Sequence, residues 1–140
     1  MYYLSLNDAI RIHDEMVSSY GGTLGIRDEK LLESAVFRCQ ASFGGEDLYR
    51  DIFEKAAAIF HGIIFDHPFI DGNKRAAVAC AIEFLERNAQ VFIASNDEVV
   101  AFPLWVERNR PEIEEIARWF KRRCRRLTKR RKSEEDSKSD

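Results

Sequence analysis

Cysteine is scarce in this sequence, and its spacing offers no disulfide framework. The 140 residues contain three cysteines, Cys39, Cys80 and Cys124, an odd number with no paired spacing. Such usage is typical of a chain kept in a reducing compartment rather than of a small disulfide scaffold. Cys80 lies in an alanine-rich run and is expected to be a small core residue.

Leader-like segments and long apolar runs are also missing. The first residues carry charges from Asp8 onward and show no basic stretch followed by an apolar one, so no export signal is expected. Charged residues break the longest apolar runs well short of a membrane span. We therefore expect a cytoplasmic protein without a membrane partner.

The usual nucleotide-binding motifs do not occur either. The sequence contains no GxxxxGK[S/T] P-loop, no GxGxxG turn and no kinase catalytic-loop pattern. An ordinary nucleotide-binding fold is therefore not expected.

Charge is distributed unevenly, although the net charge is only −2. Residues 1–120 hold 12 basic against 20 acidic residues, whereas residues 121–132 hold nine basic residues and no acid. Residues 133–140 hold four acids and one lysine. We predict one domain over residues 1–120 and a tail over 121–140 that is disordered or a fraying helix end. The alternative for residues 121–132 is binding of nucleic acid or an acidic partner through Coulomb attraction.

Apolar residues recur with helical spacing along most of residues 1–120, which predicts a compact all-α bundle of about six helices. The third helix, from about residue 51 to 65, is apolar nearly all round and should be central. Residues 40–50 contain a Gly-Gly turn and predict a loop or small hairpin. Residues 90–94 predict a short extended piece, and Pro103 is expected to interrupt or kink the fifth helix.

Residues 67–75, HPFIDGNKR, concentrate the polar chemistry between two apolar helices. The amides that open the helix after Gly72 lack internal acceptors and, with the helix dipole, favour an anion. Lys74 and Arg75 add positive charge there, so phosphates are the natural occupant. Asp71 suits Mg²⁺, which takes one or two protein carboxylates together with phosphate oxygens. His67, a residue type that often takes up protons in catalysis, lies at the other end of the segment as a candidate general base.

This segment resembles the signature loop of the Fic/Doc family, HPFx[D/E]GNGRxxR. Lys74 replaces the expected glycine, and Val78 stands where the second arginine is expected. Both departures are shared with the Doc (death-on-curing) branch, whose loop reads HxFxDxNKR. Residues 12–28 and 84–88 are also similar to that branch, so the resemblance covers roughly residues 3–120.

The resemblance implies a role for each residue of the loop. His67 would deprotonate the target hydroxyl, Asp71 would hold Mg²⁺, and Phe69 would be structural. The phosphates of ATP would be held by Gly72, Asn73, Lys74 and Arg75. Family members with the GNGRxxR form commonly transfer AMP, whereas Doc transfers the γ-phosphoryl group of ATP to elongation factor Tu. Lys74 and Val78 favour the Doc reaction, while Gly72 is Fic-like and leaves AMP transfer as the alternative.

Partners follow from the same resemblance. No segment fits the inhibitory pattern [S/T]xxxE[G/N], so control is expected from a Phd-like antitoxin, whose C-terminal segment folds onto the toxin. Residues 42–49 are either a flap that binds the target by strand addition or an unspecific surface loop. His61 is interpreted as a buried, hydrogen-bonded residue, and His13 as a structural or partner-facing residue rather than a catalytic one.

Two rival hypotheses come from other classes of protein. A metal-dependent hydrolase could use His13, Asp14, His61, His67 and Asp71, but it would leave Lys74 and Arg75 unexplained. A non-enzymatic binding module for nucleic acid or a regulatory partner would use the basic residues 121–132.

Overall fold

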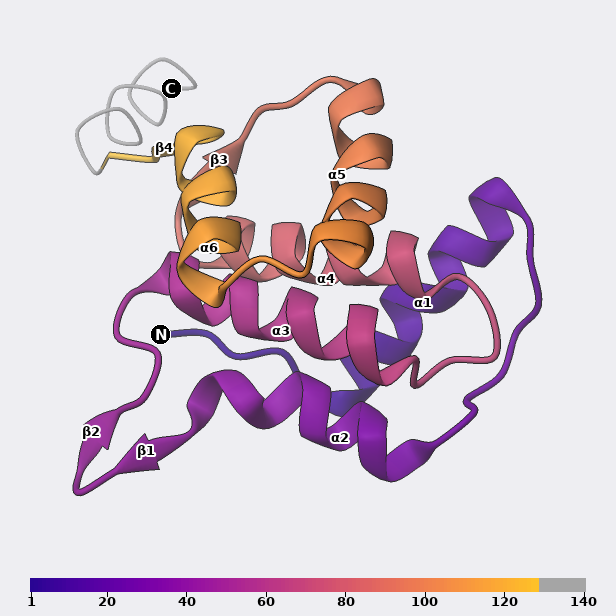
Figure 1. Cartoon of the computed structure of the whole chain (residues 1–140), viewed down its shortest axis with the longest axis horizontal. Coiled ribbons are helices and arrows are strands. Elements are labelled where there is room, and N and C mark those ends of the chain that lie inside the picture. The colour runs from indigo at the N-terminus through magenta and orange to yellow at the C-terminus, as the bar shows by residue number, and fades with distance from the viewer. Residues whose placement is uncertain (129–140) are drawn as a thin grey trace, which may run out of the picture.

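The computed structural model describes residues 1–128, which form six α-helices and two small two-stranded sheets. Figure 1 shows how these elements are arranged. The helices are α1 (Leu6–Tyr20), α2 (Glu29–Phe37), α3 (Ile52–Asp66), α4 (Asn73–Arg87), α5 (Asn96–Asn109) and α6 (Ile113–Arg122). A short 3₁₀ turn, η1 (Arg38–Gln40), follows α2. The all-α bundle predicted from the apolar periodicity is confirmed.

Helix α3 forms the centre of the bundle, as its broad apolar surface predicted. Helices α2, α4 and α6 all pack against it. Its Ile59, Phe60 and Ile63 are fully buried, together with three successive alanines at 56–58. The alanines let neighbouring helices approach closely, and burial of the larger side chains supplies most of the hydrophobic stabilisation.

The helix starts follow local sequence signals. Ser5 and Asp8 form a capping box at α1, and Ser95 and Glu98 form another at α5. Asp28 caps α2 by accepting a hydrogen bond from the Leu31 amide. Each cap satisfies amides that have no acceptor within the first turn of the helix, so these helix starts are encoded by residues close together in the chain.

The segment after η1 forms the small hairpin. Strands β1 (Ser42–Phe43) and β2 (Glu46–Asp47) pair antiparallel around the turn at Gly44 and Gly45. The Lys55 side chain of α3 is buried beneath the hairpin, and its ammonium donates to the Asp47 carboxylate (3.0 Å) and the Tyr49 carbonyl (2.6 Å). The hairpin is thus fixed to the central helix at its base.

The C-terminal part of the fold extends past residue 120, where the sequence had placed the end of the domain. Helix α6 continues to Arg122, and β4 (Cys124–Arg126) pairs antiparallel with β3 (Gln90–Phe92). The strand was not predicted because its partner lies more than thirty residues earlier in the chain. Residues 129–140 of the predicted tail lie outside the described residues. Helix α5 runs through Pro103 without the predicted interruption.

The state of the cysteines and the length and apolarity of the helices agree with what the amino-acid composition predicted. All three cysteines are free thiols, and Cys80 is a buried core residue, as expected. Burial raises the pKa of the Cys39 and Cys124 thiols to about 11, which keeps both in the unreactive protonated form. Across residues 1–128, no helix has the length and apolarity needed to cross a membrane.

Candidate functional site

The polar loop predicted at residues 67–75 connects the end of α3 to the start of α4. His67 ends α3 in the left-handed conformation (φ 48°, ψ 56°), and its side chain is exposed. Gly72 takes a left-handed conformation at the other end of the loop (φ 76°), which a glycine adopts without strain. The left-handed turn at His67 is consistent with the exclusion of the right-handed α conformation before Pro68.

Residues 25–28 hold the outer side of this loop. The Arg27 guanidinium donates to the carbonyls of His67 and Asp66, both at 2.6 Å. The backbone amides of Arg27 and Asp28 donate to the Pro68 carbonyl at 2.7 and 3.1 Å. The position of the His67 backbone is therefore fixed by a segment forty residues earlier in the chain.

His13 and Phe69 support the loop from the core side. Both side chains are buried, and their rings stack at 3.8 Å with an angle of 6° between their planes. The His13 Nε2 lies 2.7 Å from the Asp71 carbonyl, which can only accept, so Nε2 carries a proton. The Asp14 carboxylate faces the other ring nitrogen at 3.1 Å. His13 is structural, as the sequence suggested, but it acts directly on the loop.

Asn73 closes the loop on itself. Its side-chain carbonyl accepts from the Phe69 amide, and its side-chain amide donates to the Phe69 carbonyl, both at 3.0 Å. Both ends of the side chain are thus used within the loop. The backbone N–H of Asn73 at the start of α4 and the second hydrogen of its side-chain amide remain available to an anion.

Asp71 presents an exposed carboxylate at the tip of the loop. One oxygen accepts from the Thr23 amide (3.1 Å) and the other from the Gly72 amide (2.9 Å). Gly22 lies so close that a Cβ there would stand 2.9 Å from the carboxylate. The carboxylate is oriented by these contacts, and each oxygen keeps a lone pair, so the donor set fits Mg²⁺ bound by one carboxylate and phosphate oxygens.

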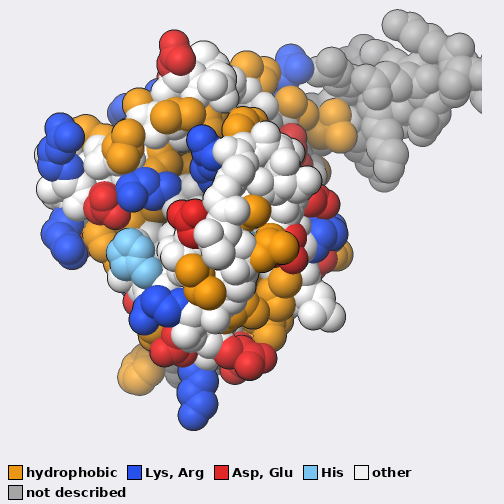
Figure 2. Space-filling model, turned by 90° about the vertical axis from the view of Figure 1, so that its right-hand side faces the viewer, with side chains coloured by type: hydrophobic (Ala, Val, Ile, Leu, Met, Phe, Trp, Pro, Cys, Tyr) orange, Lys and Arg blue, Asp and Glu red, His pale blue; other side chains and the backbone are white. Residues whose placement is uncertain are grey.

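The first turn of α4 carries cations and no acid, the reverse of what the helix dipole favours. Lys74 lies 3.4 Å from Glu107 of α5 and remains 40% exposed. Arg75 stacks on the Tyr20 ring, with its guanidinium carbon 4.5 Å from the ring centroid, and donates to the Tyr20 carbonyl. Figure 2 shows this end of the molecule, where basic side chains gather beside a histidine and several acids. Anion binding would offset the unfavourable placement of these cations.

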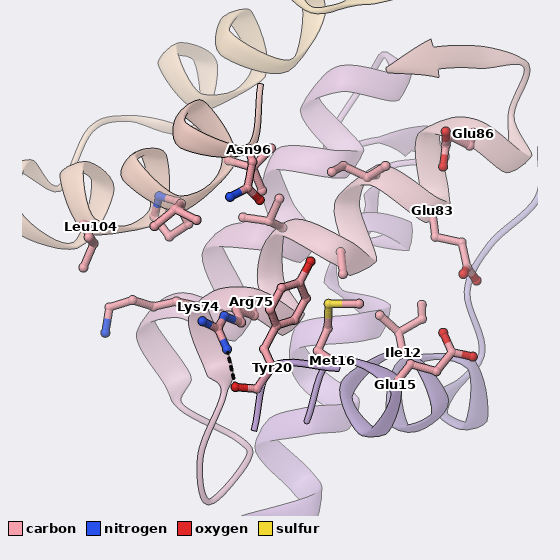
Figure 3. Close-up of a pocket in the computed structure, with 16 residues that line it drawn as sticks. Ile12, Glu15, Met16, Tyr20, Lys74, Arg75, Glu83, Glu86, Asn96 and Leu104 are labelled. Carbon is pink, nitrogen blue, oxygen red and sulfur yellow. Dashed lines mark hydrogen bonds between the residues drawn. The ribbon is translucent and has the colours of Figure 1, made fainter. Parts of the chain in front are cut away.

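A groove of about 570 Å³ opens beside these cations, between α1, α4 and α5. Figure 3 shows Lys74, Arg75 and Tyr20 at one end of it and Glu83 and Glu86 at the other, with Met16 and Ile12 between them. The sequence analysis did not identify this groove, because its lining comes from three helices that are distant in the chain.

The site residues predicted from the sequence thus occupy one loop and one helix start. His61 lies apart from them, where its Nδ1 is 3.1 Å from the Arg38 guanidinium and its ring is tilted against Phe65. In the part of the chain that the structure describes, no three His, Cys, Asp or Glu side chains form a cluster that could hold a metal alone. The arrangement required for the metal-dependent hydrolase is therefore not formed by residues 1–128. Arg27, whose role the sequence analysis missed, lies in the segment 12–28 that had shown similarity to Doc.

Comparison with known proteins agrees with this geometry. Residues 3–85, more than half of the chain, match the Fic/DOC family. The chain is 42% identical over 79 residues to "Toxin Doc" of Mycolicibacterium smegmatis, which covers 56% of this chain and 61% of that protein. It is 38% identical over 93 residues to "Protein kinase doc" of Escherichia phage P1, covering 66% of this chain and 73% of that protein. The match thus spans about three fifths of the first relative's length. The extent of the family match shows that this chain belongs to the Fic/Doc family.

Proposed function

We propose that this protein is a Doc-like toxin that transfers the γ-phosphoryl group of ATP to a hydroxyl side chain of a target protein. The observation that carries the proposal is the α3–α4 loop, which presents His67 to solvent next to a helix start bearing Lys74 and Arg75. The loop is held from three sides, by Arg27, His13 and Asn73. Such preorganisation is what phosphoryl transfer requires, because positioning and charge neutralisation supply most of its catalysis.

Each residue has a distinct task in this reaction. His67 takes the proton of the target hydroxyl. The hydroxyl oxygen then forms a bond to the γ-phosphorus of ATP, while the bond between that phosphorus and the oxygen of the ADP leaving group breaks. The α4 amides, Lys74 and Arg75 neutralise the phosphate oxygens. Asp71 would hold Mg²⁺, which when bound neutralises further charge on the phosphates.

Phosphoryl transfer is favoured over AMP transfer by the residues that differ from the GNGRxxR form. Lys74 and Val78 are shared with the Doc pattern, and one relative bears the name "Protein kinase doc". Transfer of AMP to a protein hydroxyl is the second candidate, favoured by Gly72. Elongation factor Tu is the proposed target, through the same resemblance.

An antitoxin completes the proposal, since one relative is named "Toxin Doc". The groove between α1, α4 and α5 is the proposed docking site. Its apolar floor and its oppositely charged ends would suit an amphipathic segment carrying an acid toward Lys74 and Arg75. A partner bound there would lie against the proposed phosphate site and could block the nucleotide.

The test is incubation of the purified protein with Mg-ATP and elongation factor Tu or a bacterial lysate, followed by mass spectrometry of the proteins. We expect the target to gain one phosphoryl group. His67→Ala should slow this by roughly 100- to 10,000-fold, the usual contribution of a general base. Because the His67 side chain is exposed, the variant should unfold at the same temperature as the parent.

A matched control is Lys30→Ala, which removes an exposed cation from α2. It should leave the rate of transfer unchanged. Addition of AMP instead of a phosphoryl group would establish the second candidate. Transfer that persists at full rate in His67→Ala would contradict the proposed mechanism.

A further inference from the structure

A second hollow lies between α5 and α6, away from the α3–α4 loop. Its volume is about 490 Å³, and Phe102, Trp105 and Trp119 provide its aromatic surface. In Figure 1, α6 and β4 lie at the end of the molecule opposite that loop. The proposed transfer reaction uses none of these residues.

The three rings form a nearly parallel stack. Phe102 lies 3.9 Å from Trp119, with 5° between the ring planes, and 6.1 Å from Trp105, with 14° between the planes. The Arg123 guanidinium carbon lies 4.1 Å from the Trp119 centroid. Trp105 is 42% exposed, a large fraction for a tryptophan. The stack therefore offers a flat aromatic platform that a planar ligand could extend.

Cations line part of this hollow and continue along the segment that follows it. Arg118 and Arg122 line the hollow, and Lys121, Arg125 and Arg126 are exposed on the same C-terminal segment. Glu98 and Glu115 also line the hollow, but Glu98 is neutralised by Arg123, whose Nε donates to it at 2.6 Å and lowers its pKa. Residues 118–126 carry six basic residues and no acid, so this segment is basic on an otherwise acidic body.

We propose that the α5–α6 hollow binds single-stranded nucleic acid, with a base stacked on Trp105 and the phosphates paired with Arg118 and Arg122. Stacking platforms beside cations are how proteins bind single strands without reading their sequence. An acidic peptide would satisfy the cations but leave the aromatic platform without a partner. This second activity is independent of the proposed phosphoryl transfer and would place the protein near RNA or DNA.

The two tryptophans provide a direct readout, because both tryptophans of the chain line this hollow. We would titrate the full-length protein with short oligouridylate and with oligothymidylate and follow tryptophan fluorescence. Binding should quench the fluorescence, and log affinity should fall linearly with log salt concentration. Quenching by either polymer supports the proposal, and the preferred polymer identifies the sugar.

Two variants separate stacking from charge. Trp105→Ala should weaken binding by about tenfold, followed through the remaining Trp119 or by anisotropy of a labelled oligonucleotide. Arg118→Gln with Arg122→Gln should lower the salt slope by about 1.4, since each phosphate contact of a single strand contributes about 0.7. Lys30→Gln, an exposed cation elsewhere, should change neither quantity.

Three results would overturn the proposal. Binding without quenching that Trp105→Ala leaves intact would place the nucleic acid elsewhere on the chain. Equal quenching by polyglutamate would identify an acidic peptide as the occupant. No binding of either oligonucleotide at low salt would exclude the activity.

Discussion

At the residue scale, His67 shows how a strained backbone is maintained where the proposed chemistry occurs. A left-handed conformation costs a residue other than glycine of the order of 1 kcal/mol, so other contacts must enforce it. Arg27 does so by donating to the carbonyls of His67 and Asp66. It also supplies the positive charge that favours the C-terminal end of α3. The orientation of the proposed base thus depends on a residue forty positions earlier in the chain.

Arg27→Ala should therefore reduce transfer more than it reduces stability. We expect the rate to fall by at least about tenfold, because small displacements of a catalytic group are costly, while the free energy of unfolding falls by about 1 kcal/mol. Transfer assays and urea denaturation would measure the two quantities. Arg27→Lys should fail to restore the rate, since an ammonium cannot bind both carbonyls as a guanidinium fork does. An unchanged rate in Arg27→Ala would show that other contacts suffice to hold the loop.

His61 predicts a pH dependence of stability. Burial lowers its pKa from the ordinary value of 6.5, the nearby Arg38 and Arg110 lower it further, and Asp66 opposes them. The unfolded chain therefore takes up the proton first as the pH falls. The stability that the neutral His61 contributes is complete above pH 6.5 and is lost progressively as the pH drops toward the lower folded pKa.

His61→Gln should make stability less sensitive to acid in this range. Urea denaturation between about pH 7 and pH 5.5 should show a smaller loss of unfolding free energy in the variant than in the parent. Glutamine keeps an acceptor for Arg38 but cannot titrate. Equal losses in both proteins would mean that other groups determine the acid sensitivity.

At the element scale, the β1–β2 hairpin depends on one buried lysine. The Lys55 ammonium is 1% exposed and bonds Asp47, the Tyr49 carbonyl and, at 3.5 Å, the Cys39 carbonyl. Phe43 at the tip is 86% exposed. A short exposed edge that is rigidly attached to the core is suited to strand addition, so we propose this hairpin as the site that positions the target backbone.

Lys55→Met should loosen the hairpin while preserving the bundle. The methionine fills a similar volume but leaves the carbonyls and Asp47 without their donor, so we expect a loss of about 2 kcal/mol of unfolding free energy. Hydrogen exchange should accelerate in residues 42–48 more than in α3 or α4. Modification of the target should fall more than binding of nucleotide, measured by calorimetry. Equal losses in both would indicate a general effect on folding.

At the scale of the whole molecule, the C-terminal segment completes the bundle. Arg123 joins α6 to Glu98 at the start of α5 and stacks on Trp119. The Ile93 amide donates to the Arg123 carbonyl, and the Leu127 amide donates to the Ala89 carbonyl. These hydrogen bonds connect the segment after α4 to residues 123–127, which the sequence analysis assigned to a separate tail.

Truncation at two positions tests this boundary. A chain ending at residue 128 should keep its melting temperature within about 2 °C of the full-length protein, since the described fold is intact. A chain ending at residue 120 should melt at least about 5 °C lower, because it loses β4 and the Arg123 contacts. Circular dichroism would record both transitions. Equal melting temperatures would show that β4 contributes little.

The sequence alone determined the elements whose signals are local. Capping at Ser5, Asp28 and Ser95 depends on bonds between residues three apart. The apolar periodicity that places α3 at the centre also lies within one segment. The signature at residues 67–75 identified the loop and its family resemblance for the same reason. These signals are visible in the sequence because the interacting residues are near neighbours in the chain.

The tertiary structure decided what depends on distant partners. His13 supports Asp71 across 58 residues, and Arg27 fixes His67 across 40. Contacts of this kind leave no spacing pattern, because loop closure brings together residues whose separation in sequence is arbitrary. Asn73 is an exception, because its partner Phe69 is only four residues away and yet the contact was not predicted. Its two hydrogen bonds to Phe69 form only once the loop has turned. The sequence thus specified the helices and the family's signature loop, and packing specified how that loop is held.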